Sequence, residues 1–156
     1  MTHKSQISAR RFGSRAGNTV VETALSLLLF LTIFLAIIEF GLGLFAYNFV
    51  SYAAREGALY AAVRGSLSKT PATADDVQTI VRNQAVALDS SQVTVTTTWC
   101  AIGAGGVTTC YSSPSGKNIA GNSVNVAVSY PISPLFGNFL LGNITVGSSA
   151  RMTISQ

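Results

Sequence analysis

A long uncharged apolar run near the N-terminus constrains this chain more than any other feature. From Thr23 to Ile38 no side chain is charged, and most are Leu, Ile or Phe. The apolar character extends from Val20 to Val50, interrupted by Glu22, Glu39 and Asn48. Because about 20 apolar residues span the hydrocarbon core of a bilayer, the sequence predicts a transmembrane helix.

The predicted helix is longer than a membrane requires. No proline interrupts residues 18–66, and a helix of that length extends for about 70 Å at 1.5 Å per residue. We therefore expect residues 18–66 to span the membrane and then project beyond it. Residues 67–156 remain for a small separate domain, and residues 1–17 for a polar, basic leader.

Charge is distributed unevenly along the chain. Of the ten basic side chains, four precede Gly17, which leaves six basic and six acidic residues in the remainder. The excess of positive charge therefore belongs to the leader, and the rest offers no basic surface for nucleic acid. The next basic residue is Arg55, so the positive-inside rule places the leader in the cytoplasm and the C-terminal domain outside it.

Two other kinds of N-terminal segment are alternatives to this anchor. A cleaved secretory signal has an apolar region of about 7–15 residues followed by small residues, and the run here is longer. Gly41 and Gly43 lie near its end, but Phe40, Leu42 and Leu44 interleave them. An uncleaved signal anchor that exposes a binding domain stays open as an alternative.

Residues 67–156 have the pattern of an α+β domain. A helix is predicted over Ala74–Leu88, with Thr73 and Asp76 spaced as a capping box at its start. Alternating β-branched residues then predict four strands, which together with one packed helix suggest an antiparallel sheet. The expected strands are Gln92–Cys100, Val107–Tyr111, Val124–Ser129 (ended by Pro131 and Pro134) and Ile144–Ile154 (irregular around Gly147), with an apolar loop or short helix over Leu135–Leu141.

The two cysteines, Cys100 and Cys110, lie in this domain. A zinc site would need further ligands, and the only histidine is His3 in the leader. Outside the cytoplasm a disulfide is the natural outcome, and closing so short a loop contributes about 2–3 kcal/mol in the chain-entropy model. Two buried free thiols are the alternative.

Small residues follow two rows on the projecting part of the long helix. Such residues let a neighbouring backbone approach closely. They are predicted either to pack against other subunits of an assembly or to pack on the domain's own sheet. The rows are Ala54, Ala58 and Ala62, and Gly57, Ala61 and Gly65.

Three segments carry a resemblance to a known family. The first runs from Gly17 to Leu25 (GNTVVETAL), the second is Glu39–Gly41, and the third is Ala53–Ala58 (AAREGA). With the leader, the long helix and the small sheet domain, they resemble the TadE-like pseudopilins of the tight-adherence (Flp) pilus machinery. The whole plan is similar to that of a type IV pilin.

The resemblance implies a minor pilin that takes part in assembling an adhesive surface pilus. A prepilin peptidase would cut between Gly17 and Asn18, and Glu22 would pair with the terminal amine of a neighbouring subunit. Glu39, Arg55 and Glu56 would contact partners. The implied partners are the cytoplasmic membrane, the peptidase, other pilin-like subunits and the assembly platform.

Catalysis is not expected from this composition. Beyond the long helix the only acids are Asp75, Asp76 and Asp89, and no histidine is present there to act as a base. A nucleophile–base pair or a metal site therefore lacks its parts. We expect no enzyme activity, cofactor, metal, nucleic-acid partner or small-molecule substrate.

Overall fold

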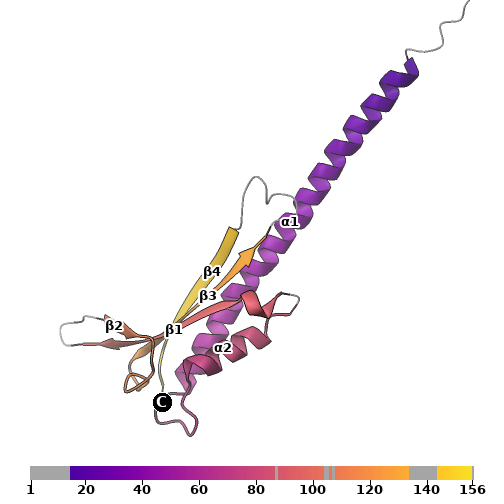
Figure 1. The fold of residues 1–156 in the computed structure, drawn as a ribbon. Helices are drawn as coiled ribbons and strands as arrows, with labels where there is room; N and C mark the ends of the chain where they lie inside the picture. Colours follow the sequence, from indigo (N-terminus) through magenta and orange to yellow (C-terminus); the bar gives the residue numbers. More distant parts are fainter. Residues whose placement is uncertain (1–14, 87, 104–105, 107, 134–143, 156) are drawn as a thin grey trace, which may run out of the picture. The chain divides into compact units, whose positions relative to one another are not determined.

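The computed structural model describes residues 15–86, 88–103, 106, 108–133 and 144–155, with backbone alone for residues 15–17. It divides into two compact units, residues 1–40 and 41–156. The α+β prediction, with a long apolar helix, four antiparallel strands and one packed helix, is confirmed (Figure 1). The elements are α1 (Arg15–Val63), α2 (Ala74–Asn83), the short 3-10 helix η1 (Ser90–Gln92), β1 (Thr94–Ile102), β2 (Thr108–Tyr111), β3 (Ser123–Ile132) and β4 (Ile144–Thr153).

The sheet lies wholly in the second unit and has the strand order β2-β1-β3-β4. All three pairings are antiparallel, and Trp99 of β1 lies opposite Val124 of β3, which in turn lies opposite Met152 of β4. Because strand side chains alternate between faces, these three residues share the inner face of the sheet. The outer face carries mostly threonine, serine and asparagine, in keeping with a face exposed to water.

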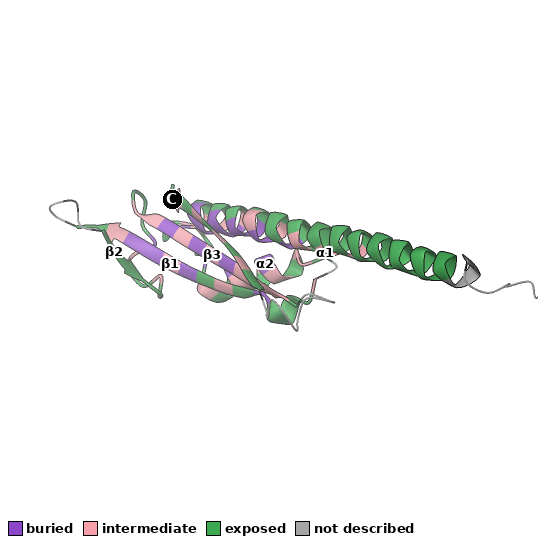
Figure 2. Cartoon of the chain, turned by 90° about the horizontal axis from the view of Figure 1, so that it is seen from above, coloured by how far each residue is buried: buried purple, intermediate pink, exposed green. Residues whose placement is uncertain are grey.

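The core forms where the inner face of the sheet meets the last part of α1 and one face of α2. Figure 2 shows burial concentrated on this part of α1 and along β1 and β3. α1 contributes mainly alanine, which brings its backbone close to the sheet. The largest fully buried side chains are Trp99, Ile154, Val50, Val77, Val81, Val93, Val124, Val126 and Val128.

α2 begins as predicted but ends earlier. The Thr73 hydroxyl accepts from the backbone N–H of Asp76, and the Asp76 carboxylate accepts from the N–H of Thr73 at 3.0 Å, so the capping box is confirmed. The Thr73 hydroxyl also donates to the Asp76 carboxylate at 2.7 Å, and this bond, together with that from the Thr73 N–H, lowers the pKa of Asp76. The helix ends at Asn83, five residues before the predicted end at Leu88. Arg82 in its last turn donates to the carbonyl oxygen of Val93, which returns the chain to the sheet.

α1 also ends before its predicted boundary. Its last residue is Val63, so Gly65 lies beyond the helix and not on the predicted helical row. Two backbone bonds close the end: Ser155 donates to the carbonyl oxygen of Ala62 at 3.0 Å, and Ala72 donates to that of Arg64 at 2.9 Å. The last carbonyl groups of a helix have no hydrogen-bond donor within the helix. Here backbone N–H groups of the linker and the C-terminal segment supply the missing donors.

Several predicted details of the strands were wrong. β1 runs from Thr94 to Ile102 rather than from Gln92 to Cys100, and Gln92 belongs to η1. Pro131 does not end its strand, because β3 continues to Ile132 and Pro131 pairs with Thr145 of β4. The β1 ladder stops at Ser129, so Pro131 lies where one side of β3 has no strand pairing and a missing N–H is tolerated. Gly147 causes no irregularity and pairs with Ser129. Pro134 and the apolar segment Leu135–Leu141 lie outside the described residues.

The disulfide prediction is confirmed. Cys100 and Cys110 lie opposite each other in the β1–β2 ladder and are bonded. Cys100 is buried and Cys110 is exposed. The bond therefore ties the four-residue strand β2 to the buried strand β1.

Candidate processing and assembly site

The predicted processing residues lie at the start of α1. The helix begins at Arg15, so the Gly17–Asn18 peptide bond belongs to its first turn. Asn18 and Glu22 are exposed, and they are four residues apart on one helix. Residues at this spacing are neighbours on a helix surface, so the side chains of Asn18 and Glu22 lie on the same face of α1.

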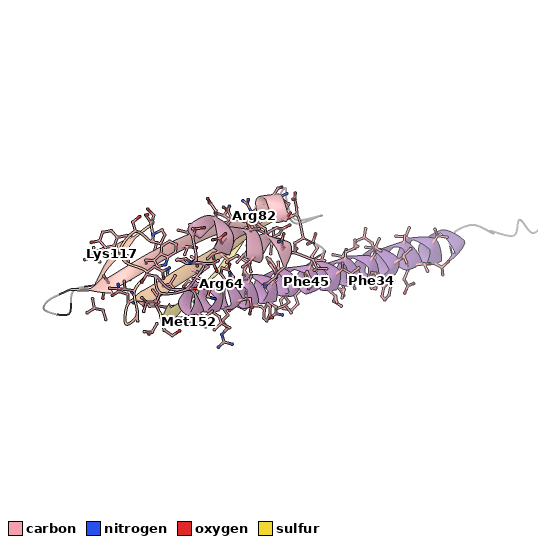
Figure 3. All side chains as sticks on the ribbon, turned by 90° about the horizontal axis from the view of Figure 1, so that it is seen from below. Phe34, Phe45, Arg64, Arg82, Lys117 and Met152 are labelled. Carbon is pink, nitrogen blue, oxygen red and sulfur yellow. A yellow bond between two sulfur atoms is a disulfide. The ribbon has the colours of Figure 1, made fainter. Side chains whose placement is uncertain are left out.

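The apolar residues that follow are exposed rather than packed by their own chain. Apart from the half-buried Leu35, the large apolar side chains between Val20 and Ile38 are 42–68% exposed. Figure 3 shows side chains projecting all around this part of α1. The helix from Asn18 to Val63 is long and apolar enough to cross a membrane, and it fits a single-pass membrane anchor.

Two threonine hydroxyl groups within this apolar stretch are satisfied inside the helix. Thr23 donates to the carbonyl oxygen of Thr19, and Thr32 donates to that of Leu28 at 2.8 Å. Bonding to the preceding turn avoids the cost of leaving a hydroxyl unpaired in lipid. Both threonines are therefore compatible with a helix that spans a membrane.

The other predicted assembly residues are distributed between the two units. Glu39 is half-buried and belongs to the first unit, as Glu22 does. Arg55 and Glu56 belong to the second unit, where Arg55 is exposed and Glu56 is half-buried. Each unit therefore carries two of these four charges.

The small residues of α1 pack on the domain's own sheet and on α2. Ala54, Ala58, Ala61 and Ala62 are all buried in the core. A Cβ added at Gly57 would lie 3.1–3.2 Å from methyl groups on both α2 and β3. Of the two readings of these rows, the structure therefore shows packing within the subunit.

Gly65, although outside the helix, is buried at the junction that follows it. The neighbouring residue Ser66 donates its backbone N–H to the carbonyl oxygen of Asn118 at 2.6 Å. The buried Asn118 amide in turn donates to the carbonyl oxygen of Arg64 at 3.1 Å. Sequence reasoning missed Asn118, because an asparagine in a polar loop gives no sign that it anchors a helix end more than fifty residues earlier.

Sequence reasoning also missed a groove between α1 and the edge strand β4. Its volume is about 540 Å³. It includes Arg55, the one lining residue that the sequence had singled out as an assembly residue. The lining residues are Ser51, Tyr52, Arg55, Ser148, Ser149, Ala150, Arg151 and Met152.

Comparison with known proteins gives one match. A protein-family model described as TadE-like protein matches residues 17–59, and no curated protein or solved structure matches the chain. The matched region begins at Gly17 and contains Glu22, Glu39 and the segment Ala53–Ala58. The resemblance inferred from the sequence is thereby confirmed as a similarity to TadE-like proteins over residues 17–59.

Proposed function

We propose that this protein is a minor pilin of a tight-adherence (Flp) pilus, anchored in the bacterial cytoplasmic membrane. Its leader lies in the cytoplasm and its sheet domain lies outside. A prepilin peptidase removes residues 1–17, and the mature chain takes part in assembling a pilus used for adhesion. One observation carries this proposal: the TadE-like match starts at Gly17 and covers both Glu22 and the apolar helix.

Cleavage would create a positively charged amino group that could pair with the Glu22 carboxylate. The new α-amino group of Asn18 would supply a positive charge as an ammonium group. Glu22, four residues along the same helix, lies near that terminus, where the helix dipole also favours a carboxylate. Pairing the ammonium of one subunit with Glu22 of its neighbour would offset the cost of placing each charge in lipid and fix the axial register.

The exposed apolar surface suits transfer from lipid to a bundle of helices. Its side chains contact lipid before assembly and neighbouring helices afterwards, so little hydrophobic free energy changes in the exchange. The shapes and charges of the helix surfaces then decide how neighbouring helices pack together. Glu39 and Glu56, further along α1, are proposed as contacts with other pilin-like subunits and the assembly platform.

Partner recovery tests this function. The native chain and a Glu22→Gln variant are expressed in cells that contain the pilus machinery, and membranes are cross-linked before purification. We expect pilin-like subunits to co-purify with the native chain and to fall at least tenfold with the variant, because the neutral amide cannot pair with an ammonium. Asp75→Asn, which removes a carboxylate from the exposed start of α2, is the matched control.

A signal-anchored binding domain unrelated to pili makes the opposite prediction. Such a protein would keep its leader, and no pilin-like subunit would be enriched with the native chain. Equal recovery with Glu22→Gln and with the native chain would remove the proposed role of that carboxylate.

A further inference from the structure

A second groove lies at the end of the sheet where β3 finishes and β4 begins, and we call it the sheet-end groove. Ile132, the last residue of β3, lines it and pairs with Ile144, the first residue of β4. The volume of the groove is about 500 Å³, within the usual range of sites for small ligands. All of its described lining residues belong to the second unit: Leu42, Phe45, Ala46, Leu88, Gln92, Tyr130, Pro131, Ile132 and Ser133.

The described lining of this groove is mainly apolar and carries no charge. Leu42 and Phe45 are 50% and 46% exposed, so the described chain leaves two large apolar side chains uncovered here. Two polar groups of the lining bond to a residue outside it. Gln92 donates to the Asp89 carboxylate at 3.1 Å, and the Tyr130 hydroxyl accepts from the Asp89 backbone N–H at 3.4 Å. The surface that remains for a ligand is chiefly hydrocarbon.

The part of α1 that lines the groove directly follows the proposed membrane span. A hydrocarbon core about 30 Å thick takes about 20 helical residues, and a span counted from Val20 then ends at Glu39. Leu42 and Ala46 lie three and seven residues beyond Glu39, or about 5–10 Å further along the helix axis. The headgroup layer is roughly 5–8 Å thick. α1 therefore enters the groove at the level of the lipid headgroups.

We propose that the sheet-end groove binds an acyl chain of a membrane phospholipid. Exposed apolar side chains continue along α1 from Ile38 through Phe40 to Leu42, so lipid is the molecule that adjoins the groove. An uncharged lining suits the acyl chain rather than the headgroup. Covering Leu42 and Phe45 with hydrocarbon would remove their apolar surface from water, which would supply the affinity.

This inference rests on the membrane attachment in the proposed function, but it needs neither removal of the leader nor assembly of a pilus. The test therefore uses the full-length chain without peptidase or other pilus proteins. A probe inside the span reports on membrane attachment in the same experiment. Failure of the groove and failure of the anchor are thus read separately.

Photo-crosslinking identifies what occupies the groove. In separate variants p-benzoylphenylalanine replaces Leu29 within the span, Phe45 in the groove, or Leu44, which is 47% exposed at nearly the same depth but is not a lining residue. Each variant is reconstituted in vesicles of phosphatidylcholine or of phosphatidylglycerol. One portion is irradiated in the vesicles and another after extraction into mild detergent. Intact mass and peptide mapping then identify the adducts.

Retention of lipid in detergent separates a bound chain from bulk lipid. In vesicles the Leu29 and Leu44 probes should both form phospholipid adducts, because both positions contact lipid. After extraction the detergent replaces loosely held lipid, so these adducts should fall. The Phe45 probe should then still give a single phospholipid adduct, with a yield at least about tenfold above that of Leu44. Both phospholipids should give equal yields, because the described lining is uncharged.

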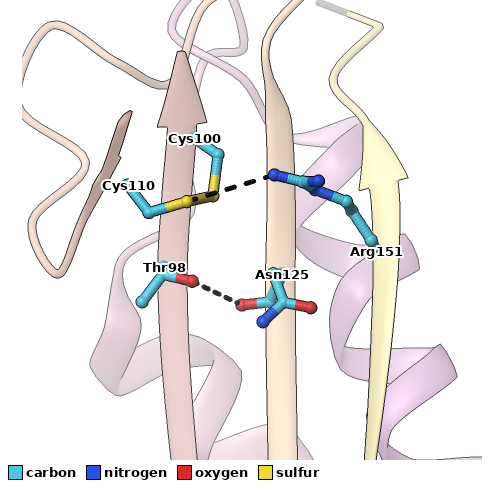
Figure 4. The surroundings of a disulfide bond; sticks show 5 residues. All are labelled: Thr98, Cys100, Cys110, Asn125 and Arg151. Carbon is cyan, nitrogen blue, oxygen red and sulfur yellow. Dashed lines mark hydrogen bonds between the residues drawn. A yellow bond between two sulfur atoms is a disulfide. The ribbon is translucent and has the colours of Figure 1, made fainter. Parts of the chain in front are cut away.

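Two isoleucines at opposite ends of the sheet provide matched substitutions in the Phe45-probe protein. Ile132→Asp puts a carboxylate into the groove and should lower the adduct in detergent at least about tenfold. The Cys100–Cys110 disulfide lies at the other end of the sheet, where Cys100 pairs with Ser123 (Figure 4). Ile102→Asp, just beyond that disulfide in β1, should leave the yield within about twofold.

Fluorescence of the buried Trp99 reports whether each variant is folded. Leu42→Asp changes a half-exposed lining residue of α1 and serves if Ile132→Asp does not fold. It should lower the adduct of the Phe45 probe in the same direction.

Several outcomes would overturn the proposal. Equal retention at Phe45 and Leu44 in detergent would mean that the groove holds no lipid of its own, and a strong preference for phosphatidylglycerol would mean that a headgroup is recognised. A Phe45 probe joined to residues 134–143 would identify another segment of this chain as the occupant, and one joined to a second copy would identify an interface between subunits. Lipid adducts at Leu29 in vesicles would leave the anchor standing in each case, whereas their absence would contradict membrane attachment and this proposal together.

Discussion

At the scale of single residues, Gly57 shows how closely α1 approaches the core. Methyl groups of Val77, Val81 and Val126 lie 3.1–3.2 Å from where its Cβ would be. Replacing Gly57 with leucine should therefore destabilise the domain by about 1–3 kcal/mol through overpacking, despite the better helix propensity of leucine. Chemical unfolding followed by Trp99 fluorescence measures the loss.

Gly41 provides the matched control on the same helix. A Cβ added at Gly41 would have no atom within 4 Å, so Gly41→Leu should leave the unfolding midpoint of the domain nearly unchanged. Equal destabilisation by the two substitutions would contradict the packing described at Gly57.

Asp76 gives the domain a defined response to acid. Its hydrogen bonds with Thr73 lower its pKa from the ordinary 3.8, so folding is favoured by the ionised form. This contribution is complete above pH 3.8 and is lost as the pH falls through the lowered folded-state value. The native chain should thus be more stable than Asp76→Asn at neutral pH, and the difference should shrink below about pH 4.

The neighbouring carboxylate Asp75 is the control for that experiment. It lies in the same first turn of α2, and in the described structure its carboxylate accepts no hydrogen bond from Thr73. Unfolding midpoints measured across the acid range should show a smaller effect for Asp75→Asn. An Asp76→Asn effect that persists unchanged at low pH would contradict the capping account.

At the scale of elements, local signals predicted the start of α2 better than its end. The capping box of α2 was predictable because Thr73 and Asp76 are close in sequence and satisfy each other. Its end at Asn83 was not, because residues 84–88 contain no Gly or Pro to stop a helix. Gln84 caps the helix end, and Arg82 in the last turn donates to the carbonyl oxygen of Val93, a contact between segments that a local pattern does not reveal.

The same limit applies to the small residues of α1 and to the groove. The spacing of Ala54, Gly57 and Ala58 predicted close helix packing, but a spacing cannot name the surface that is packed against. The groove beside β4 needed strand order and register, which depend on pairings distant in sequence. By contrast, the segments that carry the family resemblance, Gly17–Leu25, Glu39–Gly41 and Ala53–Ala58, are short stretches of contiguous sequence and could be recognised without the structure.

The disulfide stabilises the pairing of β2 with β1. Replacing Cys100 and Cys110 with serine should lower the free energy of unfolding by about 2–3 kcal/mol. It should also increase amide exchange in residues 108–111 more than in β3. Reduction of the native protein under mild denaturant should reproduce both effects, and an unchanged unfolding curve after reduction would contradict them.

At the scale of the whole molecule, the apolar part of α1 is expected to set membrane attachment. Leu29→Arg places a charge in the middle of the apolar run, at a cost of about 2.5–3.5 kcal/mol for insertion. The fraction of protein that resists alkaline extraction from membranes should therefore fall. Leu67→Arg, at a position 83% exposed in the linker after α1, should not change it. Equal extraction of the two variants would argue against a membrane-spanning role.

The mature N-terminus tests the central claim most directly. Intact mass and peptide mapping of the membrane-extracted protein, expressed with a prepilin peptidase, would be compared for the native chain and for Gly17→Trp. We predict a native chain that begins at Asn18 and a variant that keeps its leader. A native chain that still carries residues 1–17 in the presence of the peptidase would contradict processing as a prepilin and favour an uncleaved signal anchor.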